Sequence, residues 1–266
     1  MNVQVFAQSL RHIRRSLLAV GLGAAAFFYL LLLSSSSFAT DGEITGFLRE
    51  PPRAIQALVG GSFDFLRPSG WVATGMSHPI TLSLFTASAL MIASGAVATE
   101  VERGTIDLTL TRPISRSSFL AGKAAASIVA VTFVEMMGFL SALVARLTIT
   151  AVSEIGVAEL ARAFFGSWLL FSGFAMMAVL ISVHASLRGR AIGLSVGVVV
   201  LSFFVNFTAL LIDELHGLRF LSPFHYFRAS EVMDGRALSD LWALVGIGAL
   251  AAAIAFFTFA NRDIRR

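Results

Sequence analysis

Residues 100–123 read EVERGTIDLTLTRPISRSSFLAGK, a strongly polar stretch between two long apolar runs. Gly104 weakens a helix that enters this stretch, and Pro113 forbids a continuous helix through it. Between them, residues 105–111 can form one or two amphipathic turns. We therefore expect a polar loop that joins two membrane spans and carries a short helix.

The composition predicts a membrane protein. Of 266 residues, 56% are hydrophobic and 14% are charged, whereas about 25% of an ordinary soluble domain is charged. Long apolar runs recur through the whole chain, so we expect a single all-α transmembrane domain over residues 1–266 with no soluble appendage. The absence of cysteine excludes disulfides, thiolate metal sites and cysteine nucleophiles.

The N-terminal segment combines an amphipathic helix with an apolar run. Within residues 2–15, apolar side chains recur at helical spacing and arginines occupy the other face, which predicts a helix at the lipid interface. Residues 17–39 are long enough to cross the ~30 Å hydrocarbon core. A cleaved signal peptide ending near residues 37–39 is the alternative, although the apolar run is longer than the usual signal core.

The remaining apolar runs predict five more spans, which brings the total to six. These spans cover about residues 79–99, 124–145, 163–186, 191–212 and 241–260. Residues 41–77 are polar and rich in turn formers, so we expect a loop there with a short helix at residues 53–59. Six spans place both termini on one side of the membrane.

The distribution of charge predicts which side that is. If the N-terminus is cytoplasmic, the inner segments hold 12 of the 20 basic residues and four of the 16 acidic ones, although they are the shorter segments. Basic residues favour the cytoplasmic side. We therefore expect the termini and residues 100–123 in the cytoplasm.

Three stretches resemble the permeases of ABC-2 type transporters. Residues 100–108 (EVERGTIDL), 111–116 (TRPISR) and 120–123 (LAGK) are similar to the family's signature between the second and third spans. The segments LSPFHYF (221–227) and NRDI (261–264) resemble the family as well. One departure is Ala121, where many members have a bulkier aliphatic residue.

The resemblance implies a permease subunit of a bacterial ABC exporter in the inner membrane. Such a subunit pairs with a second copy or a related permease, and a separate ATPase binds ATP and Mg²⁺. This chain contains no phosphate-binding P-loop motif, because Lys123 is followed by Ala124. The docking residues that the resemblance implies are Glu100, Glu102, Arg103, Gly104, Thr105, Ile106, Asp107, Leu110, Pro113 and Arg116. From the residues alone, an ordinary cytoplasmic loop is an equal alternative.

Polar residues within the spans are candidates for a substrate pathway. Glu135 lies in the middle of a predicted span, where a charged side chain costs roughly 2.5–3.5 kcal/mol. It contacts substrate or a proton, or it forms a hydrogen bond to a serine or threonine of another helix. Asn206 and Phe203 could line an export path, although a lipid-facing surface is the commoner outcome.

Gly189, Gly193 and Gly197 repeat at four-residue spacing at the start of the fifth span. Small residues at this spacing permit close helix approach in membranes. We expect them to pack against another helix of the same chain or to form the seam of a dimer.

Two other functional classes remain as alternatives. An ion-coupled secondary transporter would require Glu135 but no ATP. An intramembrane serine hydrolase would use Ser94 and His184, although the Gly-x-Ser-Gly motif is incomplete at residues 92–95. No spacing of His, Asp or Glu suggests a metal site.

Overall fold

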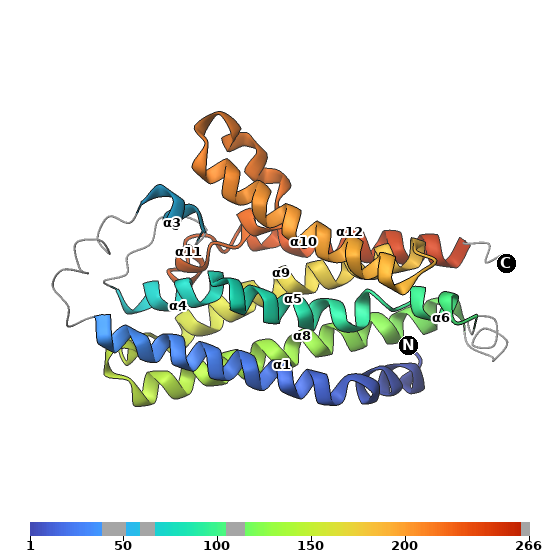
Figure 1. Cartoon of the computed structure of the whole chain (residues 1–266), viewed down its shortest axis with the longest axis horizontal. Helices are drawn as coiled ribbons and strands as arrows, with labels where there is room; N and C mark the ends of the chain where they lie inside the picture. Colours follow the sequence, from blue (N-terminus) through green and yellow to red (C-terminus); the bar gives the residue numbers. More distant parts are fainter. Residues whose placement is uncertain (39–51, 59–66, 105–114, 262–266) are drawn as a thin grey trace.

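The structure is a computed structural model that describes residues 1–38, 52–58, 67–104 and 115–261 (Figure 1). Its described elements are helices, and no strand occurs among these residues. Five of the helices are long and apolar enough to cross a membrane: α1 (Val3–Phe38), α8 (Arg116–Thr148), α9 (Val157–His184), α10 (Arg188–Leu211) and α12 (Leu241–Asn261). The prediction of an all-α, multi-pass membrane protein is confirmed.

Two shorter helices form a sixth candidate span. α4 (Pro68–Ser77) and α5 (Pro79–Ala93) meet at an angle of 53°, and the pair counts as one broken span or as a re-entrant loop. The sequence predicted a loop over 41–77, so the helix α4 is a correction. Pro68 suits the first turn of a helix, and a Cβ added at Gly75 would lie 2.9 Å from the Phe28 ring of α1. Packing on α1 therefore stabilises α4. The short helix expected at residues 53–59 is present as α3 (Arg53–Leu58).

The second predicted span, residues 79–99, is shorter than expected. α5 ends at Ala93, a turn follows, and a separate short helix, α6 (Ala98–Glu102), begins beyond it. The break has a partner in α9, because Ser182 Oγ accepts hydrogen bonds from the backbone N–H groups of Val97 and Ala98 at 3.0 and 3.1 Å. This hydroxyl satisfies donors at the start of α6 that a continuous helix would have paired internally.

The interfacial helix expected at residues 2–15 and the first span expected at 17–39 form one continuous helix. Residues 9–20 contain neither glycine nor proline, so nothing in the local sequence interrupts α1. Asn2 caps it by accepting hydrogen bonds from the N–H groups of Gln4 and Val5. At 36 residues, α1 is about 54 Å long, which exceeds the thickness of the hydrocarbon core.

The other long helices begin and end close to the predicted spans, with extensions at polar ends. α8 begins at Arg116, eight residues before the predicted span at 124, because Ser115 caps it by accepting from the Ser118 N–H. α9 begins at Val157, six residues before the prediction at 163. Helical structure therefore continues beyond the apolar runs that identified these spans.

α9 lies at the centre of the bundle and packs against α5, α8 and α12. Its aromatic residues interlock with those of its neighbours. The ring centroid of Phe164 lies 5.4 Å from that of Phe28 of α1, and the ring centroid of Phe171 lies 5.4 Å from that of Phe85 of α5. Both pairs have edge-to-face geometry. α8 also packs along α1, and Ser141 Oγ of α8 donates to the Ala25 carbonyl of α1 at 2.6 Å. α1 is therefore packed as part of the bundle.

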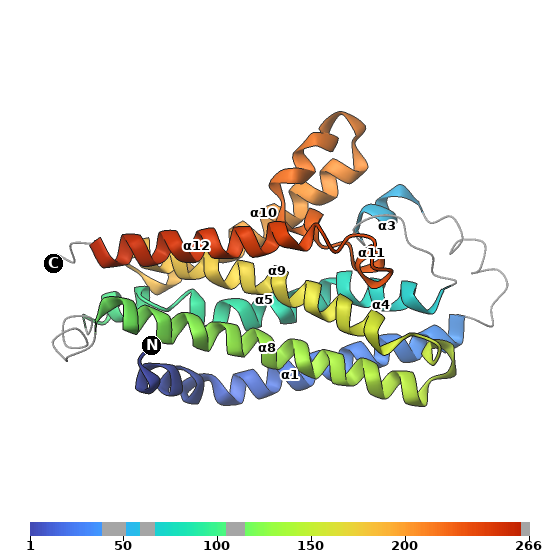
Figure 2. The ribbon, with the colours of Figure 1, turned by 180° about the vertical axis from the view of Figure 1, so that it is seen from behind.

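α10 departs from the bundle. Its C-terminal half and the 3₁₀ helix η2 (Asp213–Leu221) form a hairpin that projects away from the other helices in both views (Figures 1 and 2). Ser222 closes the hairpin by donating to the Ser202 carbonyl. η3 (Pro223–Tyr226) and α11 (Ala229–Met233) return the chain to the bundle and lead into α12.

The two ends of the bundle differ. The start of α1, α6, the start of α8 and the end of α12 gather at one end, whereas α3, α4, α11 and the projecting hairpin lie toward the other (Figure 1). The start of α1 and the end of α12 therefore lie at the end of the bundle where the signature stretch leaves α6 and returns to α8. We call this end the signature end of the bundle.

Candidate functional site

The signature end is organised around α6. Gly104 terminates this helix with φ of +65°, a left-handed conformation that glycine adopts at little cost. The N–H groups of Arg103 and Gly104 close the last turn on the carbonyls of Thr99 and Val101. The Glu-Arg-Gly sequence is thus a helix end.

Glu102 connects α6 to α10. Its Oε2 accepts a hydrogen bond of 2.7 Å from the backbone N–H of Arg188, the first residue of α10. A carboxylate at this position satisfies an unpaired donor and interacts favourably with the positive end of the helix dipole. Glu102 therefore joins two elements of the same chain.

Glu100 connects α6 to α8. Its Oε1 lies 3.5 Å from the ammonium of Lys123, and both side chains are largely shielded from solvent. The two acids of the Glu-x-Glu motif therefore contact two different long helices. A displacement of α6 would act on both α8 and α10.

Several predicted docking residues lie outside the described part of the chain. These are Thr105, Ile106, Asp107, Leu110 and Pro113. Arg116, by contrast, is the first residue of α8. The structure thus describes where the predicted docking loop leaves α6 and where it returns to α8.

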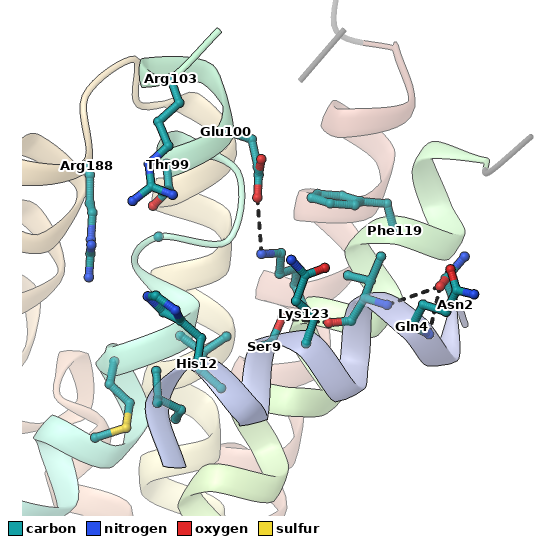
Figure 3. Close-up of a pocket in the computed structure, with 16 residues that line it drawn as sticks. Asn2, Gln4, Ser9, His12, Thr99, Glu100, Arg103, Phe119, Lys123 and Arg188 are labelled. Carbon is teal, nitrogen blue, oxygen red and sulfur yellow. Dashed lines mark hydrogen bonds and ion pairs between the residues drawn. The ribbon is translucent and has the colours of Figure 1, made fainter. Parts of the chain in front are cut away.

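An open cavity of about 420 Å³ lies beside α6 and is lined by α1, the end of α5, α8 and the start of α10 (Figure 3). Its lining is rich in polar and basic side chains. Arg103, Lys123, Arg188 and His12 contribute cationic or titratable groups from four different helices or helix ends. Glu100 is the acidic residue among the lining residues.

Glu135 lies between α8 and α9 and is 4% exposed. Ser167 Oγ of α9 donates a hydrogen bond of 2.7 Å to Glu135 Oε1, while Oε2 has no hydrogen-bond partner among the described residues. One turn away, the Trp168 indole N–H donates to Thr132 Oγ1. Of the two roles considered for Glu135, the structure contains the hydrogen bond between helices.

The other two predicted pathway residues lie elsewhere. Phe203 and Asn206 belong to the half of α10 that forms the projecting hairpin, where the Phe203 ring contacts Phe207 and Phe224. Asn206 is buried, and its Oδ1 has no hydrogen-bond partner among the described residues. The structure therefore does not bring these two residues together with Glu135.

The glycine stripe of α10 faces open space within one chain. A Cβ added at Gly189, Gly193 or Gly197 would meet no described atom within 4 Å. The close helix approach occurs instead between α9 and α12, where a Cβ built on Gly248 would lie 3.4 Å from the Cα of Gly173. Packing within the chain, one of the two roles expected for the stripe, is not present among the described residues.

Ser94 and His184 do not form a catalytic dyad. Ser94 Oγ donates to the Leu90 carbonyl, and His184 Nδ1 contacts the Leu180 carbonyl, so both side chains pair with their own helices. Within residues 1–38, 52–58, 67–104 and 115–261, no group of three or more His, Asp or Glu side chains could hold a metal ion.

Sequence analysis missed three contributors to the signature end. Lys123 was named only as the last residue of the signature stretch, Arg188 lay in the turn between the fourth and fifth predicted spans, and Ser182 lay within the fourth. A signal for Lys123 was present, because its position at the end of the signature places it beside Glu100 once the loop folds back. Nothing in the sequence pattern connects Ser182 to residues 97 and 98, more than 80 positions away.

Comparison with known proteins identifies a family. Residues 5–264 match the family described as ABC-2 family transporter protein. The match extends from the first turn of α1 to beyond the end of α12. No individual curated protein is matched to the chain.

Proposed function

Because the chain belongs to the ABC-2 family of transporter proteins, we propose that it is the permease subunit of an ATP-driven exporter whose ATP-binding subunit is a separate chain. Membership of the family makes it a multi-pass membrane subunit of an ABC transporter. The observation that supports docking of a separate ATPase is the polar turn at α6, whose Glu100 and Glu102 contact the long helices α8 and α10.

The proposed docking surface comprises residues 105–114 and the two ends from which they emerge, at Arg103 and Arg116. Glu100 and Glu102 serve a different role in this proposal, because their carboxylates contact Lys123 and the N-terminus of α10. They transmit movement of the docking loop into α8 and α10. ATP and Mg²⁺ are bound by the partner ATPase, and this chain supplies no catalytic residue.

The orientation follows from the distribution of charge. In the proposed topology the signature end faces the cytoplasm, which agrees with its basic residues and with the start of α1 and the end of α12 at that end. The ATPase can reach the docking loop only in this orientation. The proposed location is the inner membrane of a bacterium.

The proposed transporter contains two permease subunits that meet along α10. The face with Gly189, Gly193 and Gly197 has no neighbour within the described chain, and small residues allow close approach of a second helix. Asn206 lies further along the same helix but is buried on its opposite face, so the proposed seam is formed by the glycine face. A related permease would meet the same requirements as a second copy.

Copurification with the ATPase tests the docking proposal. The chain is expressed with a candidate ATP-binding subunit, and tagged ATPase is isolated from detergent extracts. Arg103→Ala should reduce the recovered permease several-fold, whereas Arg190→Ala, an exposed arginine outside the proposed surface, should not. Undiminished recovery of the Arg103 variant, together with normal transport, would contradict the assignment.

Transport in vesicles separates the remaining classes. Export that requires ATP and persists after ion gradients are dissipated supports the ABC exporter. Export without ATP that stops on dissipation would identify an ion-coupled secondary transporter, for which Glu135 should be essential. Hydrolytic activity of the purified chain that Ser94→Ala abolishes would identify a hydrolase.

A further inference from the structure

We propose that the cavity at the signature end binds a phosphate group, carried by an anionic lipid headgroup or by a soluble phosphate compound. The cavity lies between α1, the end of α5, α6, α8 and the start of α10 (Figure 3). The proposed docking and transmission roles involve Arg103 and Glu100 of its lining, but they assign no ligand to the cavity itself.

The cavity gathers cationic groups from separate elements. Arg103 follows α6, Lys123 lies on α8, and Arg188 begins α10, yet all three line one space. With Glu100 as the acidic residue of the lining, the cationic groups exceed the acidic ones even when His12 is neutral. Such an excess inside a concave surface favours an anionic ligand.

The two arginines provide the geometry for phosphate. Among the described residues, the guanidinium groups of Arg103 and Arg188 have no ion pair with a carboxylate, whereas Lys123 is paired with Glu100 at 3.5 Å. A guanidinium donates two parallel hydrogen bonds to phosphate oxygens, which suits it to this group. Figure 3 shows both arginine side chains on the α6 and α10 side of the space, with His12 facing them from α1.

Neutral donors and space complete the site. Asn2, Gln4 and Thr99 line the same cavity and offer amide and hydroxyl groups. A side chain at position 95 would occupy part of this space, because a Cβ there would lie 2.7 Å from Thr99 Oγ1 and 3.7 Å from Arg188 Nε. The volume of about 420 Å³ falls within the range of about 300–1,000 Å³ that is usual for small-ligand pockets.

The position of the cavity suggests a membrane source for the phosphate. In the proposed orientation it opens at the cytoplasmic end of the bundle, next to the inner leaflet. Basic pockets between helices at this level bind anionic lipid headgroups. The phosphate chemistry itself does not depend on the orientation, so a soluble phosphate compound is the second source to test.

The test measures ligand-induced stabilisation of the purified full-length chain in a neutral detergent. A ligand that binds the folded chain raises its melting temperature in a concentration-dependent way. The probes are dioleoyl phosphatidylglycerol, dioleoyl phosphatidylcholine, glycerol 3-phosphate and inorganic phosphate. The variants are Arg103→Gln, Arg188→Gln and the double variant, with Arg190→Gln as an exposed arginine on α10 that does not line the cavity.

We expect phosphatidylglycerol to stabilise the unmodified chain and the Arg190→Gln control to the same extent. Its apparent Kd should be about tenfold weaker or more in the double variant, which loses two charge-assisted contacts. Arg188→Lys should give an intermediate value, because it keeps the charge but loses the planar fork. Melting temperatures without added lipid report whether each variant is folded.

The outcomes separate the two sources and can overturn the proposal. Stabilisation by phosphatidylglycerol alone identifies a lipid headgroup, and equal stabilisation by glycerol 3-phosphate or inorganic phosphate identifies a soluble ligand. Equal effects of phosphatidylcholine and phosphatidylglycerol, equal responses of the double variant and the unmodified chain, or no response to any probe would refute the site. Because no ATPase is present, failure here is distinguishable from failure of the docking proposal.

Discussion

α9 and α10 are consecutive helices of nearly the same hydropathy, yet their surroundings differ. In α9, 67% of the most apolar segment is buried within the chain, whereas the corresponding figure for α10 is 22%. Apolar composition therefore identifies both as membrane helices but does not reveal which one lies inside the bundle. In a membrane, lipid and protein are both apolar neighbours, so the difference must be encoded in side-chain shape.

Small residues illustrate the difference. Gly166 and Gly173 of α9 contact neighbouring elements, since a Cβ at position 166 would lie 2.8 Å from the Phe227 ring. Gly193 of α10 is also a glycine in an apolar helix, but a Cβ added at this position would meet no described atom within 4 Å. A stripe of glycines thus indicates a close approach without saying whether the partner helix belongs to the same chain.

The largest expected contrast is between Leu170 of α9, 1% exposed, and Leu201 of α10, 65% exposed. Leu170→Ala should lower the free energy of unfolding by about 2–5 kcal/mol, because it leaves a cavity in the bundle. Leu201→Ala should change it by less than about 0.5 kcal/mol in the isolated subunit. Equilibrium unfolding in mixed micelles measures both. Equal losses for the two variants would contradict the difference in burial.

A matched pair of glycine variants tests overpacking. Gly166→Ala should cost about 1–3 kcal/mol, because the added methyl group collides with Phe227. Gly193→Ala should not destabilise the subunit, since its methyl group enters open space and alanine favours helix. The same unfolding assay reports both values, and a stable Gly166→Ala would show that Phe227 relaxes at no cost.

Substitutions of Glu135 test whether its hydrogen bond with Ser167 inside the bundle has a purely structural role. Glu135→Ala leaves the Ser167 hydroxyl without its acceptor and should cost about 1–2 kcal/mol. Glu135→Gln keeps an acceptor oxygen and should retain most of the stability and transport. If Glu135→Gln is stable but transport is lost, the carboxylate has a role in transport beyond its hydrogen bond.

The smallest expected effect on stability concerns the start of α10. Glu102→Ala removes the acceptor for the Arg188 N–H and should cost about 1 kcal/mol or less, as for an exposed helix cap. Its effect on coupling should be larger than its effect on stability. ATPase activity stimulated by the permease should fall while the melting temperature changes little. Unchanged stimulation would remove Glu102 from the transmission path.

The sequence was sufficient to predict the all-α membrane fold, because apolar runs of span length have few alternatives. It could not predict the break after Ala93, which depends on Ser182 of a helix folded beside it. α4 was also missed. Its glycine and serine content is typical of a loop, and the contact with Phe28 of α1 that stabilises it as a helix cannot be predicted from the local sequence.

At the candidate site, the sequence identified the signature stretch and its acidic residues. The partners of those acids could not be predicted, because Lys123 and Arg188 approach them only after α8 and α10 fold beside α6. The basic cavity was missed for the same reason. Its cationic groups come from distant parts of the chain, so no local pattern connects them.

Pairing through α10 is tested most directly by disulfide cross-linking in native membranes. The chain contains no cysteine, so a single Gly193→Cys substitution reports contact between two copies. Leu140→Cys, at a position on α8 that is 48% exposed, is the control. Oxidation should give a covalent dimer with Gly193→Cys and little or none with Leu140→Cys. A dimer with the α8 variant but none with the α10 variant would show that the subunits pair through a different face.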